Sequence, residues 1–546
     1  MDVRKLLMAL ILLPCLGIML MVAGRPEHAP VEAQEGGSVP AAELRDGMEV
    51  VRFDVSPRLD EVDLAALPPM EGNLNALLDP PSGLEGAFGP QDADGALQTS
   101  YPSALDRLIP EPLLSFNGPP NVQSVSPPDP VGDVGPNHYV AMANLSTQIF
   151  DKSGTSLFGP VPNNAFWSGF GGACEANNAG DPIVLHDQMA DRWYLTQFTN
   201  PSSTANFICL AVSTSPDPTG TYYRWAISMG NNFPDYPKYG IWPDGFYMST
   251  RDFAGGASFS GLGIYAIERA DLIAGDPNPT TISFILSTGA NPAYLLGDGL
   301  LPSDLDGYEL PPAGSPNYYV GSMDDGGPYG APDDALAIWE FDADFATPAN
   351  STFELVSTLP IADYDTIFPC SPGSRSCISQ HNTTNKVDVL SYRQRPMHRL
   401  AYRNFGTHEA LVTNQSVEAA PGMAGIRWWE IRDPGASATL HQEGTYAPGT
   451  TDGIHRWMGS IAQDSAGNMA LGYSASSSTV FPSSWYTGRL AGDPLGQMPQ
   501  GEASIIDGTG SQTGSQRWGD YTSMNVDPID DCTFWYVNQW VPTTSS

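Results

Sequence analysis

From about residue 113 onward, short runs rich in apolar residues are separated by glycine, proline, asparagine and aspartate. Residues 263–268, 336–342 and 426–432 are such runs, and they combine aromatic or β-branched residues with polar ones. Short alternating runs bounded by turn residues predict β-strands. No apolar stripe with helical spacing persists for three turns. The pattern therefore predicts an all-β fold.

The runs form a degenerate repeat. A turn rich in Asp, Gly or Pro is followed by a strand with a central aromatic residue, and most copies are followed by a second alternating strand and another turn. The aromatic positions of the seven copies are Tyr139, Trp193, Tyr247, Tyr318, Tyr402, Tyr473 and Trp535. Their spacings of 54, 54, 71, 84, 71 and 62 residues suit one propeller blade each, with loops of variable length. We predict a single β-propeller over residues 113–546, most simply with seven blades. Six or eight blades remain open, and stacked sandwich domains are the competing architecture.

Residues 25–112 differ in composition. They are rich in proline, alanine and acidic residues and poor in aromatics, which predicts an extended N-terminal arm or linker. Only Glu49–Val55 resembles a strand. The seventh copy has no second unit before the end of the sequence, so the last blade is incomplete, or a strand from residues 49–55 or 113–118 closes the ring.

The N-terminus indicates export. Arg4 and Lys5 precede an uncharged apolar run that ends in Val22-Ala23-Gly24, so we predict a signal peptide over residues 1–24. A retained membrane anchor is the alternative for this run. No later stretch is long and apolar enough to span a bilayer, so we expect a secreted or cell-surface protein.

The net charge of the chain limits the classes of molecule that it is expected to bind. The chain carries 61 acidic and 24 basic residues, a net charge of −37. Such a surface repels DNA, RNA and anionic membranes. Nucleic acid is therefore excluded as a partner, and an extracellular carbohydrate or protein is the expected ligand.

The cysteines agree with export. Cys370 and Cys377 flank a turn-rich spacer, which favours a local disulfide; zinc is the rival interpretation, but no CxxC or clustered histidine accompanies the pair. Cys174 with Cys209 is a second candidate pair. Cys532 is then left over.

Several motifs resemble those of large secreted bacterial β-propeller proteins, mostly uncharacterised and described as sialidase-like or glycosidase-like. The segments that carry the resemblance are 129–140, 180–188, 236–245, 455–461 and 517–536. Over about residues 115–540 the resemblance implies export and a propeller fold, and it carries no catalytic residues. The repeated Ser-x-Asp-x-Gly-x-x-Trp box of sialidases is absent.

Turns that enter the innermost strands of a propeller gather around its channel, so polar residues there can converge from several blades. The catalytic candidates are Asp133, Asp181 and Asp520, because two acids across a channel can serve as general acid and base on a glycosidic bond. The ligand-binding candidates are Lys238, Trp242, His381, Arg456, Trp457, Arg517, Trp518 and Tyr521. Arginines can clamp a carboxylate or sulfate, and aromatic rings can stack on sugars. The alternative is structural: these charges pair with one another, and the guanidinium groups cover indole faces.

Metal and cofactor signals are few. Asp324, Asp325, Asp333 and Asp334 lie in one glycine-rich loop whose oxygen ligands suit Ca²⁺, although a solvated acidic loop is the alternative. Scattered histidines do not form a zinc set, and no phosphate loop, HExxH or Gly-x-Ser-x-Gly motif is present. Two functions remain: a non-catalytic propeller that binds carbohydrate or protein, and a glycoside hydrolase or polysaccharide lyase that acts at the channel.

Overall fold

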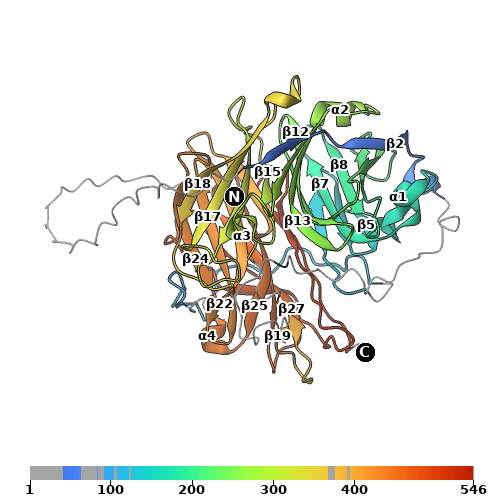
Figure 1. Ribbon diagram of the computed structural model, residues 1–546. Coiled ribbons are helices and arrows are strands. Elements are labelled where there is room, and N and C mark those ends of the chain that lie inside the picture. Colours follow the sequence, from blue (N-terminus) through green and yellow to red (C-terminus); the bar gives the residue numbers. More distant parts are fainter. Residues whose placement is uncertain are drawn as a thin grey trace, which may run out of the picture. The chain divides into compact units, whose positions relative to one another are not determined.

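The computed structural model describes residues 41–62, 83, 92–103, 107–121, 125–366, 376–389 and 394–544. The predicted signal peptide and much of the predicted arm lie outside these residues. The chain divides into residues 1–39 and residues 40–546, and every described residue belongs to the second unit. This unit is mostly β-structure with a few short helices (Figure 1).

Three consecutive antiparallel sheets follow one another along the chain, each opened by a first strand and continued by three more in sequence order. The first contains β3 (Val131–Val134), β4 (His138–Ala143), β5 (Ser146–Asp151) and β6 (Ser156–Val161). The second contains β7 (Gly180–Asp187), β8 (Arg192–Phe198), β9 (Phe207–Ser213) and β10 (Tyr222–Ser228). The third contains β11 (Asn232–Ile241), β12 (Gly245–Ala254), β13 (Ser258–Glu268) and β14 (Thr281–Ser287).

The middle of the chain forms an eight-stranded mixed sheet from two four-stranded halves. One half contains β15 (Leu301–Asp306), β16 (Asn317–Met323), β17 (Ala335–Asp342) and β18 (Thr352–Pro360). The other contains β21 (Met397–Asn404), β22 (Glu409–Ala420), β23 (Met423–Arg432) and β24 (Thr439–Tyr446). The halves join because β15 pairs in parallel with β21, from Ser303 opposite Leu400 to Asp306 opposite Arg403.

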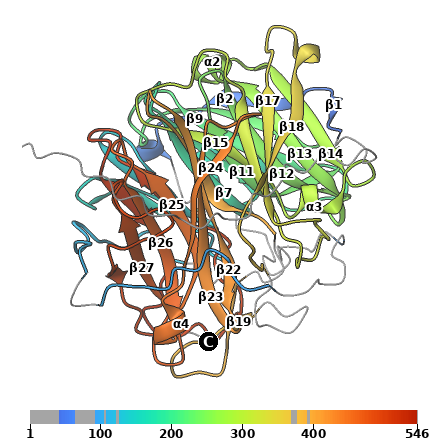
Figure 2. The same ribbon diagram turned by 90° about the vertical axis from the view of Figure 1, so that its left-hand side faces the viewer.

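The C-terminal part adds a sheet of β25 (His455–Gln463), β26 (Met469–Ser476), β27 (Ser483–Arg489) and β28 (Glu502–Ile506). It lies beside β22 and β23 (Figure 2). Two strand pairs are smaller: β19 (Ser376–Ile378) with β20 (Val387–Asp388), and β29 (Ser523–Val526) with β30 (Phe534–Val537). The α-helices are α1 (Gly172–Ala176), α2 (Arg269–Ala274), α3 (Ala293–Leu296) and α4 (Gly449–Asp452), and the 3₁₀ helices are Leu59–Glu61, Asn163–Trp167 and Pro348–Asn350. None of the described helices is long and apolar enough to cross a membrane.

The first strands of these sheets contact one another in a closed series. The contacts run from β3 to β7, β11, β15, β21, β25 and β29, and from β29 back to β3. The arrangement is therefore a propeller-like ring of small sheets, two of which merge into the mixed sheet. The predicted β-rich, propeller-like architecture is confirmed at this level.

The repeated aromatic residues lie mostly in second strands. Six of the seven occupy the second strand of their sheet, while Tyr402 lies in the first strand, β21. Tyr247, for example, is fully buried and packs edge-on against Phe341 of the next sheet. The turns ahead of these aromatic residues therefore end the first strands.

The N-terminal residues add strands to outer sheet edges. Glu49–Val55 forms β2, as predicted, and pairs with β10, while β1 (Glu43–Arg45) pairs with β14. Arg224 of β10 holds β2 through Asp54, with both hydrogen bonds at 2.7 Å. The suggestion that residues 49–55 close the ring is therefore wrong. Residues 113–118 form no strand either, and within the described chain β29 and β30 remain a two-stranded pair.

One predicted disulfide is confirmed. Cys174 of α1 is bonded to Cys209 of β9, with a Cα–Cα distance of 5.7 Å. Cys377 is also disulfide-bonded, and its predicted partner, Cys370, lies outside the described residues. Cys532 is free and exposed. Disulfides persist in oxidising compartments, which agrees with the expectation of export.

Candidate functional site

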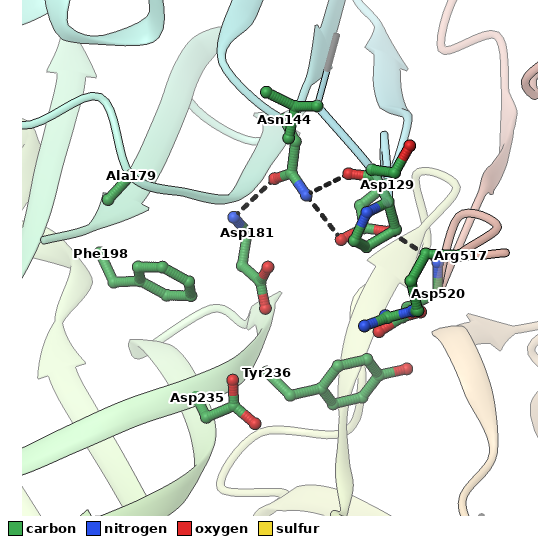
Figure 3. Close-up of a pocket in the computed structure, with 12 residues that line it drawn as sticks. Asp129, Asn144, Ala179, Asp181, Phe198, Asp235, Tyr236, Arg517 and Asp520 are labelled. Atoms are coloured by element: carbon green, nitrogen blue, oxygen red, sulfur yellow. Dashed lines mark hydrogen bonds and ion pairs between the residues drawn. The ribbon is translucent and has the colours of Figure 1, made fainter. Parts of the chain in front are cut away.

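A polar recess with an empty volume of about 420 Å³ lies where four neighbouring first strands begin. Asp129 immediately precedes β3, Asp181 begins β7, Asp235 and Tyr236 lie in β11, and Asp520 precedes β29. The complete lining is Val125, Ser126, Pro127, Asp129, Asn144, Ala179, Asp181, Phe198, Asp235, Tyr236, Arg517 and Asp520 (Figure 3). The recess therefore gathers residues that are almost 400 positions apart in the sequence.

Bulges in two first strands place the side chains of this recess. The pairing register of β7 shifts between Gly180 and Ile183, and that of β11 shifts between Asp235 and Lys238. Asp181 and Tyr236 lie inside these bulges with φ values of 42° and 49°. A bulge re-aims a side chain, and non-glycine residues with positive φ gather at functional sites. Asp129 has a positive φ of 41° as well, so the backbone accepts unfavourable conformations at three positions of the recess.

Asp129 is a buried acid of the recess. Its Oδ1 accepts a hydrogen bond from the Asp520 backbone N–H at 2.6 Å, and its Oδ2 accepts one from Asn144 Nδ2 at 2.8 Å. Burial, followed by the neighbouring Asp520 and Asp181 carboxyls, raises the pKa of Asp129 well above its ordinary value. This shift favours the protonated form, which can donate a hydrogen bond as well as accept one.

Asn144 connects the two sides of the recess. Its Nδ2 donates to Asp129, while its Oδ1 accepts a hydrogen bond from the Asp181 backbone N–H at 2.9 Å (Figure 3). Figure 3 also shows the carboxylates of Asp181 and Asp235 pointing toward one another. Asp235 is ion-paired with Arg251 at 3.0 Å. The recess therefore places carboxyl groups in different electrostatic surroundings around one space.

Two cationic side chains, Lys238 and Arg395, lie against the ring of Tyr236 in the lining of the recess. Lys238 Nζ is 3.5 Å from the ring centre of Tyr236 and 3.9 Å from that of Tyr521. Burial lowers the pKa of Lys238 to about 7, and the charge of Asp181 opposes this shift. Arg395 covers the Tyr236 ring at 3.4 Å and lies 3.7 Å from Asp520.

Arg517 adds a cation to the lining itself. It forms ion pairs with Asp520 at 2.5 Å and with Asp388 at 3.2 Å. The site is thus densely charged with both signs.

The candidates predicted from sequence fall into two sets. Asp181, Arg517 and Asp520 line the recess. Lys238 lies next to it, between the ring of Tyr236, which lines the recess, and the ring of Tyr521. The others are placed elsewhere: Asp133, Trp242, His381, Arg456, Trp457 and Trp518.

Contacts explain the positions of these other residues. Asp133 accepts backbone hydrogen bonds from Val134 and His186, and burial raises its pKa to about 8 although Arg399 opposes the shift. Arg456 pairs with Asp452 at 2.8 Å and with Glu502 at 2.6 Å, which is the structural alternative raised for these arginines.

The remaining aromatic candidates lie within the packing of the sheets, and His381 lies in a half-buried turn between β19 and β20. Trp457 and Trp518 are buried against each other, with ring centres 5.5 Å apart. Trp242 packs on Tyr402, with 4.6 Å between the ring centres. His381 lies within hydrogen-bonding distance of the Ser478 carbonyl.

Sequence reasoning did not select Asp129, Asn144 or Asp235. Asp129 belongs to the same motif as Asp133, but the motif gave no reason to prefer it. The signal that separates them is Pro130, which places Asp129 just outside the strand. No local signal identifies Asn144, because its role depends on contacts with two distant loops.

A separate acidic cluster lies in the loop between β16 and β17. One carboxylate oxygen from each of Asp324, Asp325 and Asp334 lies within 4.8 Å of the others, so these residues could hold a metal ion. Asp333, the fourth predicted ligand, is exposed and is not part of this group. The structure thus brings together three of the four predicted metal ligands of this loop.

Comparisons with known proteins add little. The sequence matches no known family model and no curated protein. Among solved structures, the chain is similar to an α-L-arabinanase of Cellvibrio cellulosa in complex with arabinohexaose, with 12% identity and a TM-score of 0.24. The match covers 58% of this chain and 95% of the arabinanase. A match of this quality carries no functional argument, so the fold description rests on the strand pairing alone.

Proposed function

We propose that this protein is an exported, seven-bladed β-propeller that binds a neutral carbohydrate in the recess around Asp129. The closed series of first-strand contacts supports the blade number, counting β29 and β30 as an incomplete last blade. The disulfide between Cys174 and Cys209 and the predicted signal peptide support export.

The observation that carries the proposal is the network of Asp129, Asn144 and Asp181 around one space. Sugar hydroxyls both donate and accept hydrogen bonds, so their site needs donors and acceptors side by side. Asp181 and Asp235 offer acceptors, while Arg517 and the protonated form of Asp129, which burial favours, offer donors. The negative charge of the whole chain favours a neutral ligand over an anionic one.

Glycoside hydrolysis is the second candidate. A glycosidase needs one carboxyl that stays protonated as the acid and a second that stays ionised. Asp129 is the candidate for the acid, because burial raises its pKa, and Asp181 is the nearby carboxyl for the second role. The two candidates share one site, so a single set of variants tests both.

Replacing Asp181 with asparagine is expected to weaken binding to a retained polysaccharide about tenfold or more, because a hydrogen bond to a charged group contributes about 1.5–3 kcal/mol. Retention in gels containing a panel of neutral polysaccharides measures the effect, and release of reducing ends is assayed in parallel. Asp433→Asn is the matched control, since Asp433 also has a positive φ but lies in an exposed turn.

The outcomes separate the two functions. Retention without product release supports the binding protein. Product release that falls about 100-fold or more in Asp129→Asn supports the hydrolase, because loss of a general acid has this magnitude. If no polysaccharide is retained or cleaved, or if Asp181→Asn and Asp433→Asn behave alike, the carbohydrate proposal is wrong.

A further inference from the structure

Two carboxylates of the acidic loop between β16 and β17 accept hydrogen bonds from nearby backbone and side-chain groups. Asp334 Oδ1 accepts a hydrogen bond from the Asp325 backbone N–H, and its Oδ2 accepts one from the Tyr364 N–H, both at 2.8 Å. Asp324 Oδ2 accepts hydrogen bonds from the backbone N–H and the hydroxyl of Thr366, both at 2.7 Å. These bonds join the loop to the segment that follows β18 and hold the carboxylates of Asp324 and Asp334 in place.

Two buried carboxylate oxygens at this position have no hydrogen-bond partner. Asp324 is completely buried, and its Oδ1 is unpartnered among the described residues. Asp365 is 2% exposed; its Oδ2 accepts a bond from the Asp92 N–H at 3.0 Å, but its Oδ1 has no partner. A buried acceptor without a donor is costly, and native structures normally satisfy it with a group, a water or an ion.

Charge around the cluster is also uncompensated. Within the described chain, none of Asp324, Asp325, Asp334 and Asp365 forms an ion pair with a lysine or arginine. Asp92 and Asp363 add further negative charge beside Asp325. Buried carboxylates are normally paired or bound to a metal.

We propose that Asp324, Asp325 and Asp334 bind one Ca²⁺ ion, with Asp365 as a neighbouring carboxylate that adds negative charge to the site. The ligands are all oxygens, which suits Ca²⁺, whereas zinc sites are built mainly from histidine and cysteine, which this cluster lacks. Ca²⁺ accepts irregular sets of six to eight oxygens, while Mg²⁺ requires near-octahedral geometry. Asp325 is exposed, so water can complete the coordination shell.

The ion also stabilises the attachment of an N-terminal segment. Besides the bond from Asp92 to Asp365, the Gly95 N–H donates to the Asp363 carbonyl at 2.9 Å. Asp94 is ion-paired with Arg427 at 2.8 Å. Because Asp92 repels the carboxylates of Asp325 and Asp365, a bound cation lowers the cost of holding this segment against the sheet.

The test is calorimetric titration of the full chain with CaCl₂ after removal of metal with EGTA. We expect Ca²⁺ to bind and to raise the melting temperature, and an equal concentration of Mg²⁺ to have a much smaller effect. Asp325→Asn and Asp334→Asn should each weaken this binding at least tenfold. Asp333→Asn, an exposed acid of the same loop outside the cluster, should bind Ca²⁺ as the parent does.

Hydrogen exchange provides a second measurement. Ca²⁺ should slow exchange of the backbone amides in residues 92–98 in the parent and in Asp333→Asn, but not in Asp325→Asn. Asp325 is exposed, so its substitution does not depend on refilling a buried position. Absence of Ca²⁺ binding in the parent, or equal losses in Asp325→Asn and Asp333→Asn, would overturn the proposal.

Discussion

Replacing Arg399 with methionine is expected to lower the free energy of unfolding by about 3–5 kcal/mol. The Arg399 guanidinium is 2% exposed and donates from Nε to Asp304 at 3.0 Å and from Nη2 to Asp306. Its Nη1 donates to the Met524 carbonyl of β29 at 3.2 Å. Arg399 itself lies in β21, so one side chain connects the first strands β15, β21 and β29. Methionine occupies a similar volume but leaves the buried carboxylates of Asp304 and Asp306 without a cation.

Denaturant unfolding monitored by tryptophan fluorescence measures this loss. Arg58→Met is the control, because Arg58 pairs with Asp60 at the surface, and its removal should change stability far less. The triple variant Arg399→Met/Asp304→Asn/Asp306→Asn should recover part of the stability, because it removes the uncompensated charges. A single variant Arg399→Met as stable as the parent would show that these carboxylates are already compensated without the arginine.

Asp252→Asn is expected to change the pH dependence of stability by up to about 3 kcal/mol between pH 4 and 7. Burial raises the pKa of Asp252 from 3.8 to about 6. The folded state therefore holds a proton that the unfolded state releases near pH 4. This stabilisation is complete below about pH 4 and is lost as the pH rises through 6. Asparagine lacks this titration, so the parent should lose stability relative to the variant across the window.

Urea unfolding at pH 4, 5, 6 and 7 gives the difference between the two proteins. Asp60→Asn, the control, changes an exposed carboxylate. Its difference in stability from the parent should be the same at all four pH values. The side chain of Asp252 accepts hydrogen bonds from Thr250, Tyr265 and Asn232. If the parent instead gains stability relative to Asp252→Asn as the pH rises, these donors hold Asp252 ionised in the folded state.

The candidate site shows which functional residues the local sequence pattern can predict and which it cannot. Asp181, Arg517 and Asp520 could be selected because polar residues ahead of an inner strand tend to reach the channel. The same rule selected Arg456, which is neutralised by Asp452 and Glu502 instead. Whether a charge meets a ligand or a partner depends on what the neighbouring sheet places opposite it. That information is absent from the residues around Arg456.

Several features of this protein follow from the sequence alone. Alternating runs and turn residues determine short strands such as Glu49–Val55, because the strand period and turn chemistry are local properties. The seven-fold repeat of aromatic residues predicted a ring of similar sheets, and the charge of −37 predicts that nucleic acid is not a partner.

Tertiary structure alone decided which repeats meet and which acids converge. Asp129 accepts a hydrogen bond from Asp520, 391 positions away, and Asp324 meets Thr366 only because the loops of β16 and β18 fold together. The merging of two sheets through β15 and β21, and the attachment of β2 to β10, are likewise unmarked in the residues that form them. Local sequence sets which side chains a strand presents, whereas closure of the ring sets which of them share a space.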